Sequence, residues 1–263
     1  DEWAALFADP PVRNNLQNKL KNGPFIPLAE AQARVDQWRA DAAAQAETHG
    51  SENFNKTILS LYDLTGNWAR PWAEAGYNVL MFDIQSGQDV NEFSVEYFNE
   101  NYDITDVYGI LIAQPCTDFA VSGARHFAAK DARGDTAKSI ELVHQSLRTV
   151  EYFRPKFWAL ENPVSRISTL TDLPQWGLMF DHADFGDPYT KKTILWGKFN
   201  SELPTANVDP VEGSKMHAKY GGKSQATKNA RSATPEGFAY AFFKANNYAD
   251  RSAEDRLPDD YPE

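Results

Sequence analysis

Two side chains suited to covalent and acid–base chemistry follow short apolar segments. Cys116, the single cysteine of the chain, follows the segment 107–113, and Glu161 follows the segment 157–160. A thiolate is a strong nucleophile, and amide donors and the dipole of a following helix can lower its pKa. A carboxyl group delivered by an apolar strand can be desolvated, which raises its pKa and lets it donate a proton near neutral pH. A packed thiol and a structural capping carboxylate are the alternative interpretations.

A candidate ligand-binding turn follows an earlier apolar segment. The segment 57–62 runs into Asp63-Leu64-Thr65-Gly66-Asn67-Trp68, and the next apolar segment ends at Asp83, followed by Ile84. A glycine after a strand lets the backbone approach a ligand, and an acid at the end of the next strand is placed to bind ribose hydroxyls. Because only one glycine is present, the dinucleotide fingerprint is absent. An ordinary strand–helix turn is the alternative.

The elements that would position these residues alternate between strand and helix. Such alternation predicts βαβ units in an α/β fold: an open, mostly parallel sheet with helices on both faces. In such a sheet, ligands lie beyond the carboxyl ends of the strands. The expected strands are Thr57–Tyr62, Asn78–Asp83, Gly109–Gln114, Lys156–Leu160 and Thr193–Trp196. The expected helices are Leu28–His49, Ala69–Ala75, Val90–Asn99, Asp118–Ala129, Thr136–Phe153 and Pro235–Asn246, with Gly50 ending the first.

Composition excludes several classes of protein. The 263 residues carry a net charge of −11, and 42% of them are hydrophobic, which excludes a disordered chain. One cysteine excludes an intramolecular disulfide scaffold. The longest strongly apolar stretch, 107–113, is far shorter than the roughly 20 residues needed to span a bilayer, and the first residues lack the pattern of a signal peptide. We therefore expect a cytosolic protein with no membrane partner.

Positive charge is concentrated in one segment of this acidic chain. Residues 212–231 contain three glycines, and five cations stand against the single carboxylate of Glu212: Lys215, Lys219, Lys223, Lys228 and Arg231. The segment is expected to be a mobile basic loop, either a contact for a nucleic-acid backbone or a solvated surface loop. The tail at 250–263 is acidic and is expected to be a frayed end.

Histidine chemistry is not predicted. No histidine stands at an expected strand end, which disfavours a cysteine hydrolase. His182 lies among Asp181, Asp184 and Asp187, but these residues lack a defined ligand spacing, so we expect a solvated loop and no metal.

At these residues the chain resembles the cytosine-C5 DNA methyltransferases, in particular the compact phage and prophage members. The turn Asp63–Trp68 is similar to the family's cofactor-binding motif, and Asp83 matches the acid that holds the ribose of S-adenosylmethionine. Gln114-Pro115-Cys116 stands where the family has its Pro-Cys nucleophile motif, and Glu161-Asn162-Pro163 stands where it has Glu-Asn-Val. The resemblance implies a Rossmann-like class I methyltransferase fold with S-adenosyl-L-methionine as cofactor.

The resemblance also implies roles for individual residues. The catalytic residues would be Cys116, Glu161 and Lys191. The cofactor-binding residues would be Asp63, Leu64, Thr65, Gly66, Trp68, Asp83, Ile84, Asp103, Ile104, Pro115 and Thr234. The nucleic-acid contacts would be Arg166, Lys192, Lys215, Lys219, Lys223 and Lys228.

The chain departs from the family pattern in two further places. The two arginines of the family's Gln-x-Arg-x-Arg motif are replaced by Lys191 and Thr193, which assigns phosphate gripping or orientation of Glu161 to Arg166 or Lys192. Only residues 200–229 stand where the family has its long target-recognition domain. Sequence-specific reading of duplex DNA is therefore not implied.

The expected organisation has four parts. Residues 1–55 form a helical N-terminal extension, 56–200 a catalytic domain, 201–233 a short basic loop region, and 234–263 a closing helix and acidic tail. The expected activity is methylation of cytosine C5 in duplex or single-stranded DNA through a covalent Cys–C6 adduct, in the cytoplasm of a bacterium or phage-infected host. The alternatives are an enzyme acting on a free pyrimidine nucleotide, transfer of a group other than methyl, and a catalytically silent cofactor- or nucleic-acid-binding protein.

Overall fold

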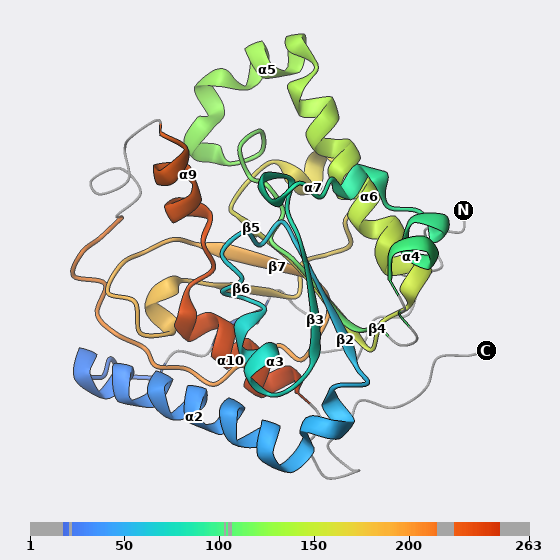
Figure 1. Ribbon diagram of the computed structural model, residues 1–263. Helices are drawn as coiled ribbons and strands as arrows, with labels where there is room; N and C mark the ends of the chain where they lie inside the picture. Colours follow the sequence, from blue (N-terminus) through green and yellow to red (C-terminus); the bar gives the residue numbers. More distant parts are fainter. Residues whose placement is uncertain (1–17, 21–22, 103, 105–106, 215–223, 248–263) are drawn as a thin grey trace.

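The fold is α/β, with an open, mostly parallel sheet between two layers of helices (Figure 1). The computed structural model describes residues 18–20, 23–102, 104, 107–214 and 224–247. The strand order is β1-β6-β7-β5-β4-β2-β3. The strands are β1 (Asn18–Lys19), β2 (Thr57–Leu61), β3 (Asn78–Phe82), β4 (Val107–Ile112), β5 (Phe157–Pro163), β6 (Leu178–Phe180) and β7 (Thr193–Lys198).

Strand direction brings the chemically interesting segments to one edge of the sheet. The pairs β3·β2, β2·β4 and β4·β5 are all parallel, so the carboxyl ends of these four strands share one rim. Strand β7 runs antiparallel to both of its neighbours, β5 and β6. The result is a Rossmann-like sheet with one reversed strand near an edge.

Two apolar layers cover the two faces of the sheet. Along β5, Phe157 and Ala159 belong to one cluster and Trp158 and Leu160 to the other, as the two-residue period of a strand requires. The first layer contains α2 (Leu28–Asn53), α3 (Arg70–Glu74) and α10 (Glu236–Asn246). The second contains α4 (Val95–Asn101), α6 (Asp135–Phe153) and α7 (Ile167–Leu170), with α5 (Phe127–Arg133) packed on α6.

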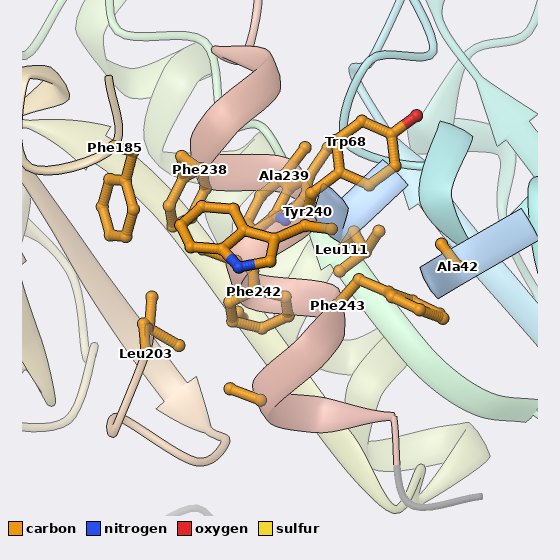
Figure 2. Close-up of a cluster of buried hydrophobic side chains, with 14 of the residues drawn as sticks. Ala42, Trp68, Leu111, Phe185, Leu203, Phe238, Ala239, Tyr240, Phe242 and Phe243 are labelled. Atoms are coloured by element: carbon orange, nitrogen blue, oxygen red, sulfur yellow. The ribbon is translucent and has the colours of Figure 1, made fainter. Parts of the chain in front are cut away.

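Aromatic packing fixes α10 against the turn that follows β2. Phe238 and Phe242 of α10 lie against the indole of Trp68, with ring centroids 5.6 and 5.5 Å apart (Figure 2). On the sheet side, Phe180 stacks on Phe238 at 4.5 Å. Because these rings are buried, their packing fixes the position of α10 relative to the turn after β2 and to β6.

The expected strands are present, and four sequence expectations are wrong. The helix expected over Val90–Asn99 is divided into a 3-10 helix over residues 90–92 and α4. The helix expected over Asp118–Ala129 is instead a turn followed by the 3-10 helix η3 (Val121–His126) and α5. Gly50 does not end the first helix, because α2 continues to Asn53. The basic segment is not a loop throughout, because residues 225–232 form the helix α9 (Gln225–Ser232) with Ser224 as its N-cap.

The described part of the expected N-terminal extension contributes to the main core. Strand β1 pairs with β6, and α2 buries Ala31, Val35 and Trp38 in the layer shared with α10. The remaining 3-10 helices are η1 (Ile84–Ser86), η2 (Val90–Glu92) and η4 (His182–Asp184). None of the helices in the described ranges is both long and apolar enough to cross a membrane.

Adding the same methyl group at two glycines is expected to have opposite effects. A Cβ atom at Gly109 would lie 2.1 Å from the buried ring of Phe157, so Gly109→Ala should lower the free energy of unfolding by about 1–3 kcal/mol. Nothing lies within 4 Å of a Cβ at Gly50, which is inside α2, so Gly50→Ala should raise it by about 0.5–1 kcal/mol. Urea denaturation of both variants measures the two changes, and equal signs would contradict this packing.

Candidate active site

The turn after β2 is organised around a buried carboxylate. Asp63 accepts hydrogen bonds from the backbone amides of Trp68 (3.1 Å) and Ala69 (3.3 Å), and from the hydroxyls of Ser60 and Thr65 (3.2 Å each). Burial raises the pKa of Asp63, while these donors oppose the shift. The carboxylate therefore fixes the backbone conformation of the turn through these hydrogen bonds.

The backbone of the same turn lies close to β3. Gly66 has φ +66°, and a Cβ there would stand 2.9 Å from the sulfur of Met81. Leu64 and Thr65 are exposed, whereas Trp68 is buried in the aromatic core. A ligand bound at the exposed side of this turn can therefore contact Leu64, Thr65 and backbone atoms. The indole of Trp68 packs on the buried side of the turn.

The end of β3 carries the expected acid and an exposed apolar side chain. One carboxylate oxygen of Asp83 accepts from the amide of Gln85 at 2.8 Å and caps η1. The neighbouring Ile84 is 65% exposed. Ile104 packs against the second apolar layer, and Asp103 lies outside the described residues.

The residues at this rim fit a polar cofactor with an apolar ring. The hydroxyl of Thr234 is buried and has no hydrogen-bond partner, although its backbone carbonyl accepts from the side chain of Asn67 at 3.1 Å. Asn67 belongs to the turn after β2, so the unpaired hydroxyl lies beside that turn. The close backbone at Gly66, the carboxylate of Asp83 and the exposed Ile84 complete a donor and acceptor set that suits S-adenosyl-L-methionine.

Cys116 lies in the loop after β4 and is held from the adjacent strand. The side-chain amide of Asn162 donates to the carbonyl of Gln114 at 3.0 Å, which ties the Gln114-Pro115-Cys116 segment to β5. The Cys116 carbonyl accepts from the amides of Phe119 and Ala120, at 3.0 and 2.8 Å, and closes a tight turn. As whole residues, Cys116 and Pro115 are both of intermediate exposure.

The expectation that the dipole of a following helix lowers the pKa of Cys116 is wrong. Burial raises the pKa of the Cys116 thiol, and the negative charge of Glu161 raises it further. Lys191 and Arg231 oppose both effects. Because a turn rather than a helix follows the cysteine, the thiolate is stabilised by these two cations and by a backbone hydrogen bond at Cys116, and a helix dipole does not contribute.

Glu161 and Lys191 face each other across β5 and β7. The Lys191 ammonium lies 3.9 Å from a carboxylate oxygen of Glu161, and both side chains are only 12% exposed. Burial raises the pKa of Glu161, as the sequence predicts, and Lys191 partly offsets the shift. The structure thus brings Cys116, Glu161 and Lys191 together at one rim.

Three residues of this site belong to the sequence motifs or to the basic segment, but sequence reasoning assigned them no role in it. Asn162 positions the cysteine loop, Asn67 contacts Thr234, and Arg231 lies near enough to Cys116 to lower its pKa. Arg231 is the last cation of the basic segment and stands three residues before Thr234. No local signal separates it from the other cations, because its relation to Cys116 depends on how α9 packs.

The expected nucleic-acid contacts are distributed unevenly. The guanidinium of Arg166 is engaged by Asp131 at 2.9 and 2.6 Å and lies 3.7 Å from the ring centre of Phe127, so a phosphate would have to compete with these partners. Lys192 and Lys228 are exposed. Lys215, Lys219 and Lys223 lie outside the described residues.

The expectation of a solvated loop around His182 is wrong. His182 is buried, and its ring nitrogens lie 3.2 Å from the Tyr189 hydroxyl and 3.4 Å from the Thr193 hydroxyl. Burial lowers the pKa of His182 well below its usual value, so the ring is neutral. Within the described ranges, no cluster of three or more His, Cys, Asp or Glu side chains is arranged to hold a metal ion.

Comparison with known proteins identifies one class of relative. The chain is similar to the type II methyltransferase M.DdeI of Desulfomicrobium norvegicum, with 24% identity over 179 residues. The match covers 56% of this chain and 41% of that protein, so the chain spans less than half of its relative. No protein-family model matches the chain, and no solved structure does. With the Rossmann-like fold, the similarity indicates a relationship to methyltransferases.

Glu161→Gln is expected to stabilise the protein in a pH-dependent manner. Below the ordinary glutamate pKa of 4.5 both folded and unfolded states are protonated, so the variant and the wild type should be equally stable. As the pH rises above 4.5, the unfolded wild type ionises first because the folded pKa is raised, and wild-type stability falls. The variant should therefore be more stable at pH 8, by about 1 kcal/mol. Denaturation at both pH values measures this, and a destabilised variant at pH 8 would contradict it.

Proposed function

We propose that this chain is an S-adenosyl-L-methionine-dependent methyltransferase that acts on C5 of cytosine in DNA. The observation that supports the proposal most directly is the meeting of Cys116, Glu161 and Lys191 at the rim where the turn after β2 also ends. The similarity to a type II methyltransferase supports the class of reaction. A DNA substrate would locate the enzyme in the cytoplasm of a bacterium or a phage-infected cell.

The cofactor would supply an electrophilic methyl group. We assign its binding to the Asp63-organised turn, with Leu64, Thr65 and the Gly66 backbone facing it and Trp68 supporting the turn. Asp83 would bind the ribose hydroxyls, and the exposed Ile84 would cover the adenine. The unpaired Thr234 hydroxyl would bond the polar amino-acid end. The resemblance adds Asp103, Ile104 and Pro115 to this set.

The substrate carbon at C5 is a weak nucleophile until the ring is activated. We assign the activation to the Cys116 thiolate, whose lone pair forms a bond to C6, while the protonated Glu161 donates to N3. The raised pKa of Glu161 suits a carboxyl group that must hold its proton near neutral pH. After methyl transfer, a base removes the C5 proton, and its bonding electrons re-form the C5–C6 double bond and expel the thiolate.

Lys191 would balance the charges of Cys116 and Glu161. Its ammonium stands 3.9 Å from Glu161 and lowers the pKa of Cys116, so it favours the thiolate without closing a tight ion pair with the carboxyl group. A base within a duplex must leave the stack to reach this centre, at a cost of a few kcal/mol, whereas a single strand avoids most of that cost.

The DNA backbone would be held by the basic segment at 212–231. Lys228 on the exposed surface of α9 and Lys192 beside Lys191 are the described cations available for phosphate contacts. The resemblance adds Lys215, Lys219 and Lys223. Arg166 is left out of the proposal because Asp131 and Phe127 already engage its guanidinium.

Cys116→Ser is expected to abolish methyl transfer while cofactor affinity stays unchanged, because the hydroxyl keeps the shape of the site but is a far weaker nucleophile. Transfer of labelled methyl to duplex DNA, single-stranded DNA and dCMP, with calorimetry of S-adenosylhomocysteine binding, measures both properties. Retained transfer by the variant would reject the nucleophile. Transfer to dCMP alone would replace DNA by a free nucleotide as the substrate.

Affinity for DNA is expected to fall steeply with added salt. Each phosphate contact contributes a slope of roughly −0.9 to the logarithm of the binding constant against the logarithm of salt concentration for duplex DNA. Lys228→Ala should weaken binding to all sequences about equally and reduce the slope by about one contact. Fluorescence anisotropy across a salt series measures the slope, and a flat response would count against a polymer substrate.

A further inference from the structure

Helix α9 lies against the rim of the sheet and is held there by polar contacts. None of its residues, 225–232, is buried, and its N-terminus is capped by the Ser224 hydroxyl accepting from the Thr227 amide at 3.2 Å. The chain continues from it through Thr234 into α10 (Figure 1). A helix without an apolar anchor is positioned by the groups that bond its side chains and its free carbonyls.

The first set of contacts joins α9 to the segment after β3. The amides of Gln85 and Asn229 bond each other reciprocally, at 3.3 and 3.1 Å. Gln225 donates to both, at 2.8 Å to Asn229 and 3.3 Å to Gln85. Gln85 stands two residues after Asp83, so these contacts connect α9 to the proposed ribose-binding segment.

The second contact joins the other end of α9 to the catalytic centre. The ammonium of Lys191 donates to the Arg231 carbonyl in the last turn of α9 at 3.2 Å and lies farther, 3.9 Å, from Glu161. An ammonium group is favoured at a helix C-terminus, where free carbonyls carry negative partial charge. The docked helix therefore keeps Lys191 between the two acceptors.

We propose that Gln85 and Asn229 are positioning residues that dock α9 on the rim and thereby hold Lys191 and Arg231 beside Cys116. Neither amide touches the thiol, so both act through the two cations. The proposal relies on the proposed function only for the role of Cys116 as the nucleophile.

Undocking of α9 would change the charges around Cys116 in one direction. The charged groups that act on the thiol are Glu161 on β5, Lys191 before β7 and Arg231 on α9. Without the Arg231 carbonyl, Lys191 would close onto Glu161 and be neutralised by it, and Arg231 would leave with the helix. Both changes remove positive charge from the surroundings of the thiol and therefore disfavour the thiolate.

The single cysteine gives a readout that needs neither substrate nor turnover. Iodoacetamide reacts with the thiolate, so the rate of alkylation against pH reports the ionisation of Cys116 alone. We expect Gln85→Ala and Asn229→Ala each to slow alkylation near pH 7.5 by about threefold or more, with wild-type rates restored at high pH. Because both substitutions break the same contact, the double variant should be no slower than the slower single variant.

The matched control is Ala230→Ser, an exposed position on α9 outside these contacts, which should leave the profile unchanged. A general loosening of the protein would expose the thiol and speed alkylation at every pH, which is the opposite result. An unchanged profile in Asn229→Ala, or additive effects of the two substitutions, would overturn the proposal. Absence of methyl transfer by the wild-type protein, together with the expected alkylation shift in the variants, would instead reject the proposed function and leave this docking intact.

Discussion

One lysine ammonium, shared between a buried carboxylate and a helix carbonyl, is the interaction on which the candidate site depends. Lys191 faces Glu161, the Arg231 carbonyl and the thiol of Cys116 from a single position. A tight ion pair with Glu161 would keep the carboxyl group ionised, and complete removal of the lysine would leave the thiol buried beside a negative charge. At its observed position, Lys191 favours the thiolate of Cys116 and still allows Glu161 to hold a proton.

Buried polar contacts hold the loops that carry this arrangement, including one residue with a strained backbone. Tyr62 adopts φ +61°, an uncommon conformation for a residue with a side chain, immediately before the turn at Asp63. Its hydroxyl lies 3.1 Å from that of Ser146, which donates to the side chain of Gln114 at 3.3 Å. This chain of contacts links the proposed cofactor turn to the cysteine loop, so the two halves of the site are positioned by one buried network.

The central strands and the rim were predictable from sequence because their signals are local. A fully buried parallel strand such as β4 reads as a continuous apolar run, and the polar residue after it must lie at the carboxyl end. The reversed direction of β7 depends on pairing with β5 and β6, which no local pattern encodes. Strand β6 has three residues, too few to form a pattern.

The remaining errors have the same origin in tertiary context. Helix α9 contains no large apolar residue, so its composition resembles that of a loop until its contacts with Gln85 and Lys191 are known. The pKa of Cys116 is raised because the thiol is buried and lies near Glu161, and neither property can be read from the cysteine segment alone. Arg231 enters the site only through the placement of that helix.

The most direct test of the account is a search for the covalent bond between Cys116 and a pyrimidine. An oligonucleotide containing 5-fluorocytosine has no C5 proton to lose, so the thiol cannot be expelled after methyl transfer and the adduct should accumulate. The account predicts that duplex or single-stranded oligonucleotide, incubated with the protein and S-adenosyl-L-methionine, yields an adduct that peptide mass spectrometry maps to Cys116. A stable protein that binds the cofactor and the oligonucleotide yet forms no adduct, or forms one at another residue, would contradict it.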